Sequence, residues 1–112
     1  MIDYLGGGDI AGGKLKESGT THWLSPNTGA TNVTGFTALS GGMFWWGGAF
    51  DPMNWDWSNL QSYGYWWAAG SYLGAIPTGL WCFDIGFNNS WITGMGTIYR
   101  EDKMSVRCIK DN

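Results

Sequence analysis

The chain has 112 residues, with six Lys and Arg side chains against nine Asp and Glu, and a net charge of −3 at neutral pH. A chain of this length accommodates one domain, and its negative charge offers no attraction to the phosphates of nucleic acid. No apolar run approaches the roughly 20 residues that span a bilayer, and no signal peptide is recognisable, so we expect one soluble domain without membrane insertion.

The first part of the chain is rich in turn-forming residues. Residues 1–5 are apolar and end at a run of three glycines, so we expect them to be the last turn of a helix. Residues 12–42 contain many Gly, Pro, Asn and Ser, with apolar anchors only in residues 14–16 and 36–39. We expect this half to be mostly ordered loop.

From residue 63 onward the pattern is typical of β-strands. Segments rich in aromatic and branched side chains, bounded by Gly, Pro or Asn, are residues 63–69, 80–87, 97–99 and 104–109. Their spacing favours an antiparallel sheet. In the last segment Met104, Val106 and Cys108 alternate with polar residues, so we expect a strand with one buried face.

Blocks spread over nearly the whole chain are shared with one protein family. They are residues 11–17, 19–23, 25–32, 35–39, 41–42, 64–67 and 105–111, among them Gly64-Tyr65-Trp66-Trp67 and Ser105-Val106-Arg107-Cys108. In these blocks the chain closely resembles the Fibrobacter succinogenes major paralogous domain. The resemblance implies an α+β, C-type-lectin-like fold related to formylglycine-generating enzymes, in secreted or cell-surface proteins of Fibrobacter and Bacteroidetes.

The chain departs from the family pattern in two places. Family members usually have further elements on the N-terminal side, so the domain is expected to be truncated there or completed by another chain. The family's terminal cysteine, matched by Cys108, then lacks its usual partner, and either Cys82 replaces that partner or Cys108 is free. After Trp67, residues 68–71 lack the hydroxyls and the carboxylate that are common in the family, which leaves the geometry of the next loop open.

Three stretches between the shared blocks match nothing in the family: residues 43–57, 70–81 and 83–98. Some domains of this family and fold are targets of diversity-generating retroelements, which randomise surface codons and leave the scaffold intact. The alternation here resembles such a diversified binding face. We therefore expect residues 43–59 and 70–81, supported by residues 83–91, to form the binding surface.

Aromatic side chains dominate these stretches. Nine tryptophans exceed what a core of this size can enclose, and aromatic rings among small polar residues are typical of binding surfaces. The predicted ligand-binding residues are Phe44, Trp45, Trp46, Trp55, Asp56, Trp57, Asn59, Tyr72, Trp81 and Trp91. The predicted structural residues are Trp23, Trp66, Trp67, Cys82 and Cys108.

No set of residues indicates catalysis or a metal cofactor. His22 is the only histidine, and with two separated cysteines the chain lacks the ligands of a zinc site. A structural calcium stays open through Asp51, Asn54, Asp56 and Asn59, although their order does not fit an EF-hand.

We therefore expect a non-catalytic binding or adhesion domain, extracellular, on a cell surface or on a phage particle, that binds a protein or a cell-surface glycan. Two alternatives remain. Sugar rings stacked on the tryptophans would make the domain a carbohydrate-binding module. An aromatic surface buried in a larger assembly would make it a structural subunit of a surface appendage or phage tail fibre, with homo-oligomers or a complementing chain.

Overall fold

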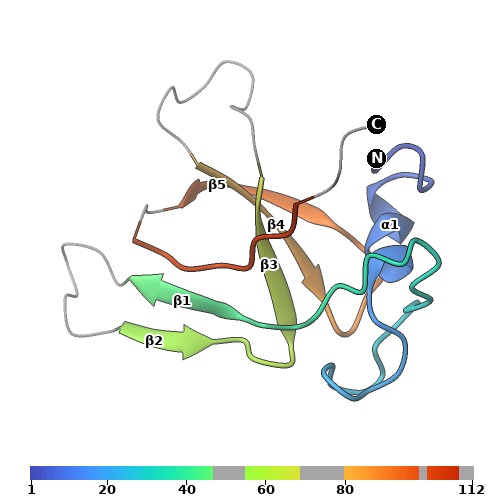
Figure 1. Cartoon of the computed structure of the whole chain (residues 1–112), viewed down its shortest axis with the longest axis horizontal. Coiled ribbons are helices and arrows are strands. Elements are labelled where there is room, and N and C mark those ends of the chain that lie inside the picture. Colours follow the sequence, from blue (N-terminus) through green and yellow to red (C-terminus); the bar gives the residue numbers. More distant parts are fainter. Residues whose placement is uncertain (47–54, 69–79, 99–100, 109–112) are drawn as a thin grey trace.

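The computed structural model describes residues 1–46, 55–68, 80–98 and 101–108 (Figure 1). Within them lie one helix and five strands: α1 (Gly8–Leu15), β1 (Met43–Trp46), β2 (Trp55–Ser58), β3 (Tyr63–Ala68), β4 (Leu80–Gly86) and β5 (Thr93–Ile98). The first two strands form one antiparallel sheet, and the other three form a second antiparallel sheet in the order β3-β4-β5. The chain therefore has an α+β fold.

The helix begins at Gly8, the third glycine of the run at positions 6–8, so the prediction of a helix end at residues 1–5 is wrong. Those residues form turns, in which the Leu5 N–H donates to the Met1 carbonyl oxygen at 3.1 Å. The glycines inside α1 are needed for close contact, since a Cβ at Gly12 would clash with the Trp91 carbonyl oxygen and one at Gly13 with the Gly29 carbonyl oxygen. Tertiary packing thus outweighs the low helix propensity of glycine.

Two core clusters lie in different parts of the fold. The first joins α1 and the loops of residues 17–42 to β4 and contains Leu5, Ala11, Leu15, Trp23, Ala38 and Ile85. The second joins β1 to the middle of the larger sheet and contains Met43, Tyr65 and Cys82. The larger sheet lies between α1 and the two-stranded hairpin, as Figure 1 shows.

The larger sheet holds two of the tryptophans that were predicted to be structural. Trp66 is paired with Phe83 and Trp67 with Cys82 in the β3–β4 register. Trp66 packs against the first core cluster, and its ring meets the Phe36 ring edge-on at 6.3 Å between centroids. The predicted strands at residues 63–69 and 80–87 are thus found as β3 and β4. The second is one residue shorter than predicted, and residue 69 lies outside the described part of the structure.

The strand predicted at residues 97–99 begins earlier, at Thr93, and runs to Ile98. Glycines at positions 94 and 96 weaken the strand pattern there, and pairing with β4 decides the structure. Residues 43–59, which were predicted to belong to the binding surface, contain the strands β1 and β2.

The C-terminal segment is not the regular strand predicted from residue 104 onward. Its described residues make isolated pairings, of Lys103 with Phe44 in β1 and of Ser105 with Trp66 in β3. The segment changes neighbour after two residues, so it ties the two sheets together instead of extending one of them. The predicted buried face is also wrong, because Val106 is 72% exposed and Cys108 is exposed.

Candidate functional site

The β1–β2 hairpin brings four aromatic residues into register. Phe44 is paired with Trp57, and Trp46 with Trp55. The rings of Phe44 and Trp57 meet edge-on, with centroids 5.9 Å apart and planes at 69°. Aromatic residues suit strands, and edge-to-face contact is a favoured geometry for two rings. The hairpin is therefore held together by aromatic side chains as well as by backbone hydrogen bonds.

Lys103 holds the other edge of β1. The Phe44 N–H donates to the Lys103 carbonyl oxygen at 2.9 Å, and the Lys103 N–H donates to the Phe44 carbonyl oxygen at 3.0 Å. The Lys103 ammonium nitrogen also lies 5.2 Å from the centre of the Phe44 ring, within the range of a cation–π interaction. The Phe44 ring is thus contacted by both Trp57 and Lys103, which fixes its orientation.

The hairpin is buried at its base and exposed further out. Met43 is 3% exposed in the second core cluster, whereas Trp45 is 43% and Trp57 is 56% exposed. Because cross-strand partners share a face, Trp57 lies with Phe44 on the face opposite that of Met43 and Trp45. Trp46, Trp55 and Asp56 belong to the same two strands, and their side chains lie outside the described part of the structure.

Asn59 and Gly42 form the base of the hairpin. Asn59 has a positive φ of 62°, and its side-chain amide donates to the Tyr65 hydroxyl at 2.9 Å. Its carbonyl oxygen accepts hydrogen bonds from the Ser62 and Tyr63 N–H groups. On the other strand, the Gly42 N–H donates to the Tyr63 carbonyl oxygen at 2.9 Å. The amide of Asn59 therefore joins β2 to β3.

The comparison with protein families is decisive for this chain. The family model described as the Fibrobacter succinogenes major domain matches residues 1–110. The chain belongs to the Fibrobacter succinogenes major domain family. The resemblance seen in the sequence is thereby confirmed, and the match covers both core clusters and the hairpin. Comparison with curated proteins and with solved structures gives no match.

In this family member the remaining predicted binding residues do not join the hairpin. Trp91 is 57% exposed, and its neighbours are bonded to α1, through the Gly13 N–H to the Ser90 carbonyl oxygen and the Ile92 N–H to the Gly8 carbonyl oxygen. Because α1 and the hairpin lie on opposite sides of the larger sheet, Trp91 is at the other end of the domain (Figure 1). Trp81 lies in β4, and Tyr72 falls outside the described residues.

A cluster of polar side chains lies near the second core cluster. The pKa of the Cys82 thiol is raised to about 11, mainly by burial and to a smaller extent by the carboxylates of Asp84 and Asp102. Burial also raises the pKa of Asp84, whose Oδ1 atom is buried and has no hydrogen-bond partner in the described structure. Burial likewise raises the pKa of Tyr65. This cluster was not predicted from the sequence. The signal that could have indicated it is an Asp within the otherwise apolar β4.

The structure also decides between the alternatives for the cysteines. Cys82 and Cys108 are both free, the first buried in the centre of the larger sheet and the second exposed. Cys82 therefore does not replace the missing partner of Cys108. A buried thiol with a raised pKa is a poor nucleophile, because the thiolate is the reactive form.

His22 is engaged with a carboxylate. Its Nδ1 atom lies 2.9 Å from Oε2 of Glu17, at the edge of a shallow cavity of about 300 Å³ whose lining includes Ser40 and Gln61. The Ser40 hydroxyl donates a hydrogen bond to the His22 carbonyl oxygen. This hydroxyl proton is therefore hydrogen-bonded to the backbone and does not face the imidazole.

The described part of the chain contains neither a metal-binding cluster nor a membrane-spanning helix. In the described ranges, no group of three or more His, Cys, Asp and Glu side chains lies close enough to hold a metal ion. The helix that the structure describes, α1, is too short to cross a membrane. Asp51 and Asn54, two of the candidate calcium ligands, fall outside the described residues, so the calcium site stays a prediction.

Proposed function

We propose that this family member is a non-catalytic, extracellular binding or adhesion domain on a C-type-lectin-like scaffold, and that the β1–β2 hairpin is its contact surface. The observation that supports this most strongly is the exposure of Trp45 and Trp57 on a hairpin whose base, Met43, is buried. In the β1–β2 register Trp57 lies with Phe44 on one face of the hairpin and Trp45 lies on the other face, so each face presents an exposed indole ring. Exposed apolar side chains of this kind are typical of interaction sites.

The rings of the hairpin are also held in place before any ligand binds. The strand register, the edge-on contact of Phe44 with Trp57 and the cation of Lys103 each restrict them. Ordering fewer side chains on binding leaves more of the contact energy as affinity. Tryptophan supplies a large contact area with few rotatable bonds, which is why it is common among the residues that dominate binding energy.

The place of the hairpin in the sequence supports the same proposal. Both strands lie in residues 43–59, mainly within a stretch that matches none of the blocks shared with the family. A scaffold with a changeable hairpin would suit diversification by a retroelement. Related copies of the coding region should then differ mainly at surface positions of residues 43–98 and agree in residues 11–42 and 103–111.

The direct test is binding of the fluorescently labelled domain to bacterial and host cells, measured by flow cytometry. Trp57→Ala and Trp45→Ala should each weaken binding by about 2 kcal/mol, or roughly 30-fold in Kd. Trp91→Ala is the matched control, because Trp91 has nearly the same exposure, 57% against 56%, but lies at the other end of the domain. Equal loss in the Trp91 and Trp57 variants would rule out the hairpin as the specific surface.

The same assay separates the alternatives. Each exposed tryptophan of the hairpin, Trp45 on one face and Trp57 on the other, suits stacking against a sugar ring, which favours a carbohydrate as the second candidate ligand. Periodate treatment of the cells would abolish glycan binding, and protease treatment would abolish protein binding. Sedimentation of the domain alone tests the third possibility, in which oligomers or a complementing chain bury the hairpin and no soluble ligand exists.

A further inference from the structure

A second candidate site lies on the side of the larger sheet that packs against α1. It is a cavity of about 180 Å³ whose walls come from distant parts of the chain. Its lining includes Leu15, Phe36, Trp66, Phe83 and Ile85. Arg107, from the C-terminal segment, is the charged residue among the described residues of the lining. The cavity is thus apolar, with the guanidinium of Arg107 at its wall.

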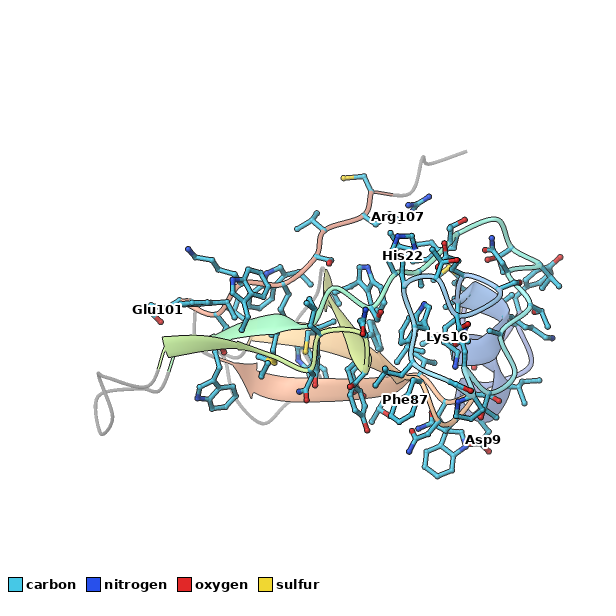
Figure 2. All side chains as sticks on the ribbon, turned by 90° about the horizontal axis from the view of Figure 1, so that it is seen from below. Asp9, Lys16, His22, Phe87, Glu101 and Arg107 are labelled. Atoms are coloured by element: carbon cyan, nitrogen blue, oxygen red, sulfur yellow. The ribbon has the colours of Figure 1, made fainter. Side chains whose placement is uncertain are left out.

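Arg107 is placed to receive an anion. Its guanidinium carbon lies 4.9 Å from the centre of the Phe36 ring, and it has no salt bridge or hydrogen bond to any other residue that the structure describes. Figure 2 shows Arg107 on the C-terminal segment, at the outside of the molecule. A guanidinium that stacks on a ring keeps the N–H donors in its own plane available. Within the described part of the chain, the cation is therefore oriented by Phe36 and has no anionic partner.

We propose that this cavity binds a small carboxylate that carries one aromatic ring, with the ring in the cavity and the carboxylate on Arg107. The size supports one ring, because a dry cavity of about 150 Å³ takes up benzene. Phe36, Trp66 and Phe83 offer ring faces and edges for contact. Arginine pairs with carboxylates through two parallel hydrogen bonds, which gives such a site its specificity.

Two sources share this chemistry. One is a free aromatic acid, and the other is the C-terminus of a peptide that ends in an aromatic residue. This site is separate from the β1–β2 hairpin, so the proposal holds or fails independently of the proposed function.

The experiment is a titration of the full 112-residue chain with 3-phenylpropionate, followed by calorimetry and by NMR. The neutral 3-phenylpropionamide keeps the ring but lacks the charge, so it tests the role of the carboxylate. Propionate keeps the charge but lacks the ring, so it tests the role of the ring. The acid should bind at least about tenfold more tightly than the amide, and propionate should not saturate. Contacts between the ligand ring and the methyl groups of Ile85 and Ile92 should locate it in the cavity.

Three variants test the roles of the residues. Arg107→Gln should make the acid and the amide bind equally, and Ala68→Leu, which adds volume at the cavity wall, should weaken both by about tenfold. Lys103→Gln is the control, since Lys103 also lies over a ring, that of Phe44, but does not line the cavity. Thermal unfolding of each variant establishes that it is folded.

A short peptide ending in phenylalanine, with a free or an amidated C-terminus, distinguishes the two sources. Tighter binding of the free-carboxylate peptide than of 3-phenylpropionate would identify a peptide end as the ligand, and the reverse would identify a free acid. The proposal is overturned if the unaltered domain binds acid and amide equally. It is also overturned if Arg107→Gln keeps the preference for the acid, or if the ligand contacts the hairpin instead of Ile85.

Discussion

The Lys16 ammonium group donates a hydrogen bond to the Gly86 carbonyl oxygen at 3.0 Å, across 70 residues of chain. It also donates to the carbonyl oxygens of Thr28 and Asn89, each at 2.8 Å, and the side chain is fully buried. All three ammonium hydrogens are therefore used. Figure 2 shows Lys16 in the interior beside α1, where it joins the end of the helix to the end of β4.

Lys16→Met should be strongly destabilising. It leaves one buried and two partly buried carbonyl oxygens without this donor, so we expect the free energy of unfolding to fall by about 3 kcal/mol. Lys14→Met is the matched control, because Lys14 makes one such bond, to the Leu5 carbonyl oxygen at 2.8 Å, and should lose about 1 kcal/mol. Urea unfolding measures both, and equal losses would contradict the role given to Lys16.

Stability should depend on pH through the same lysine. Burial lowers the pKa of Lys16 from 10.5 to about 8, so between these values the unfolded chain binds more protons than the folded one. The contribution of Lys16 to the free energy of unfolding should therefore rise as pH rises from about 8 to 10.5. The difference between the unaltered domain and Lys16→Met isolates this contribution from Cys82, whose raised pKa acts in the opposite direction. A difference that stays constant over this window would show that Lys16 titrates normally.

The two cysteines should differ sharply in reactivity. Cys108 is exposed, whereas Cys82 is buried with a pKa of about 11, so that about one Cys82 in a thousand is a thiolate at pH 8. A chromogenic thiol reagent should modify one cysteine rapidly in the folded domain and both in urea. The Cys108→Ser variant should show no rapid phase. Rapid modification of both thiols in the folded domain would be inconsistent with a buried Cys82.

Gly42 should tolerate no side chain, because both its backbone conformation and its close contact with β2 exclude one. Its φ is +63°, and a Cβ would clash with the Ser58 carbonyl oxygen in β2. Gly35 has nearly the same φ, +68°, with open space around it, so Gly35→Ala should cost about 1 kcal/mol from the backbone alone. Gly42→Ala should cost at least about 2 kcal/mol more, since the hairpin must shift. Similar losses of unfolding free energy for Gly42→Ala and Gly35→Ala in chemical unfolding would show that β2 shifts at little cost.

Substitution of Trp57 and of Trp23 should have very different effects on stability, because the first lies at the surface and the second in the core. Trp57→Ala removes the edge-on contact with Phe44 from a side chain that is 56% exposed, so it should cost about 1 kcal/mol of stability. Trp23→Ala should cost about 4 kcal/mol, because Trp23 is buried and its indole N–H donates to the Ala38 carbonyl oxygen at 2.9 Å. If calorimetry showed that the Trp57 variant is globally unfolded, Trp57 would have to be assigned to the core instead of the surface.

Several elements were missed in the sequence for identifiable physical reasons. The helix Gly8–Leu15 contains three glycines, which argue against a helix locally, yet two of them permit contacts with the carbonyl oxygens of Trp91 and Gly29. The strand Met43–Trp46 has four residues, too few for an alternating pattern to be distinguished from an aromatic loop. The burial of Lys16 was not foreseen, because lysine is usually exposed and its three partners lie 12 to 73 residues away.

The sequence by itself determined the family, the strands Tyr63–Ala68 and Leu80–Gly86 and their place in an antiparallel sheet, and the excess of tryptophan over what a small core can hold. These features depend on residue order and composition, which are visible locally. Only the tertiary structure decided which tryptophans are exposed, that Trp91 lies apart from Trp57, and that Arg107 faces an apolar cavity. Such relationships arise from contacts between segments far apart in the chain, on which no local pattern reports.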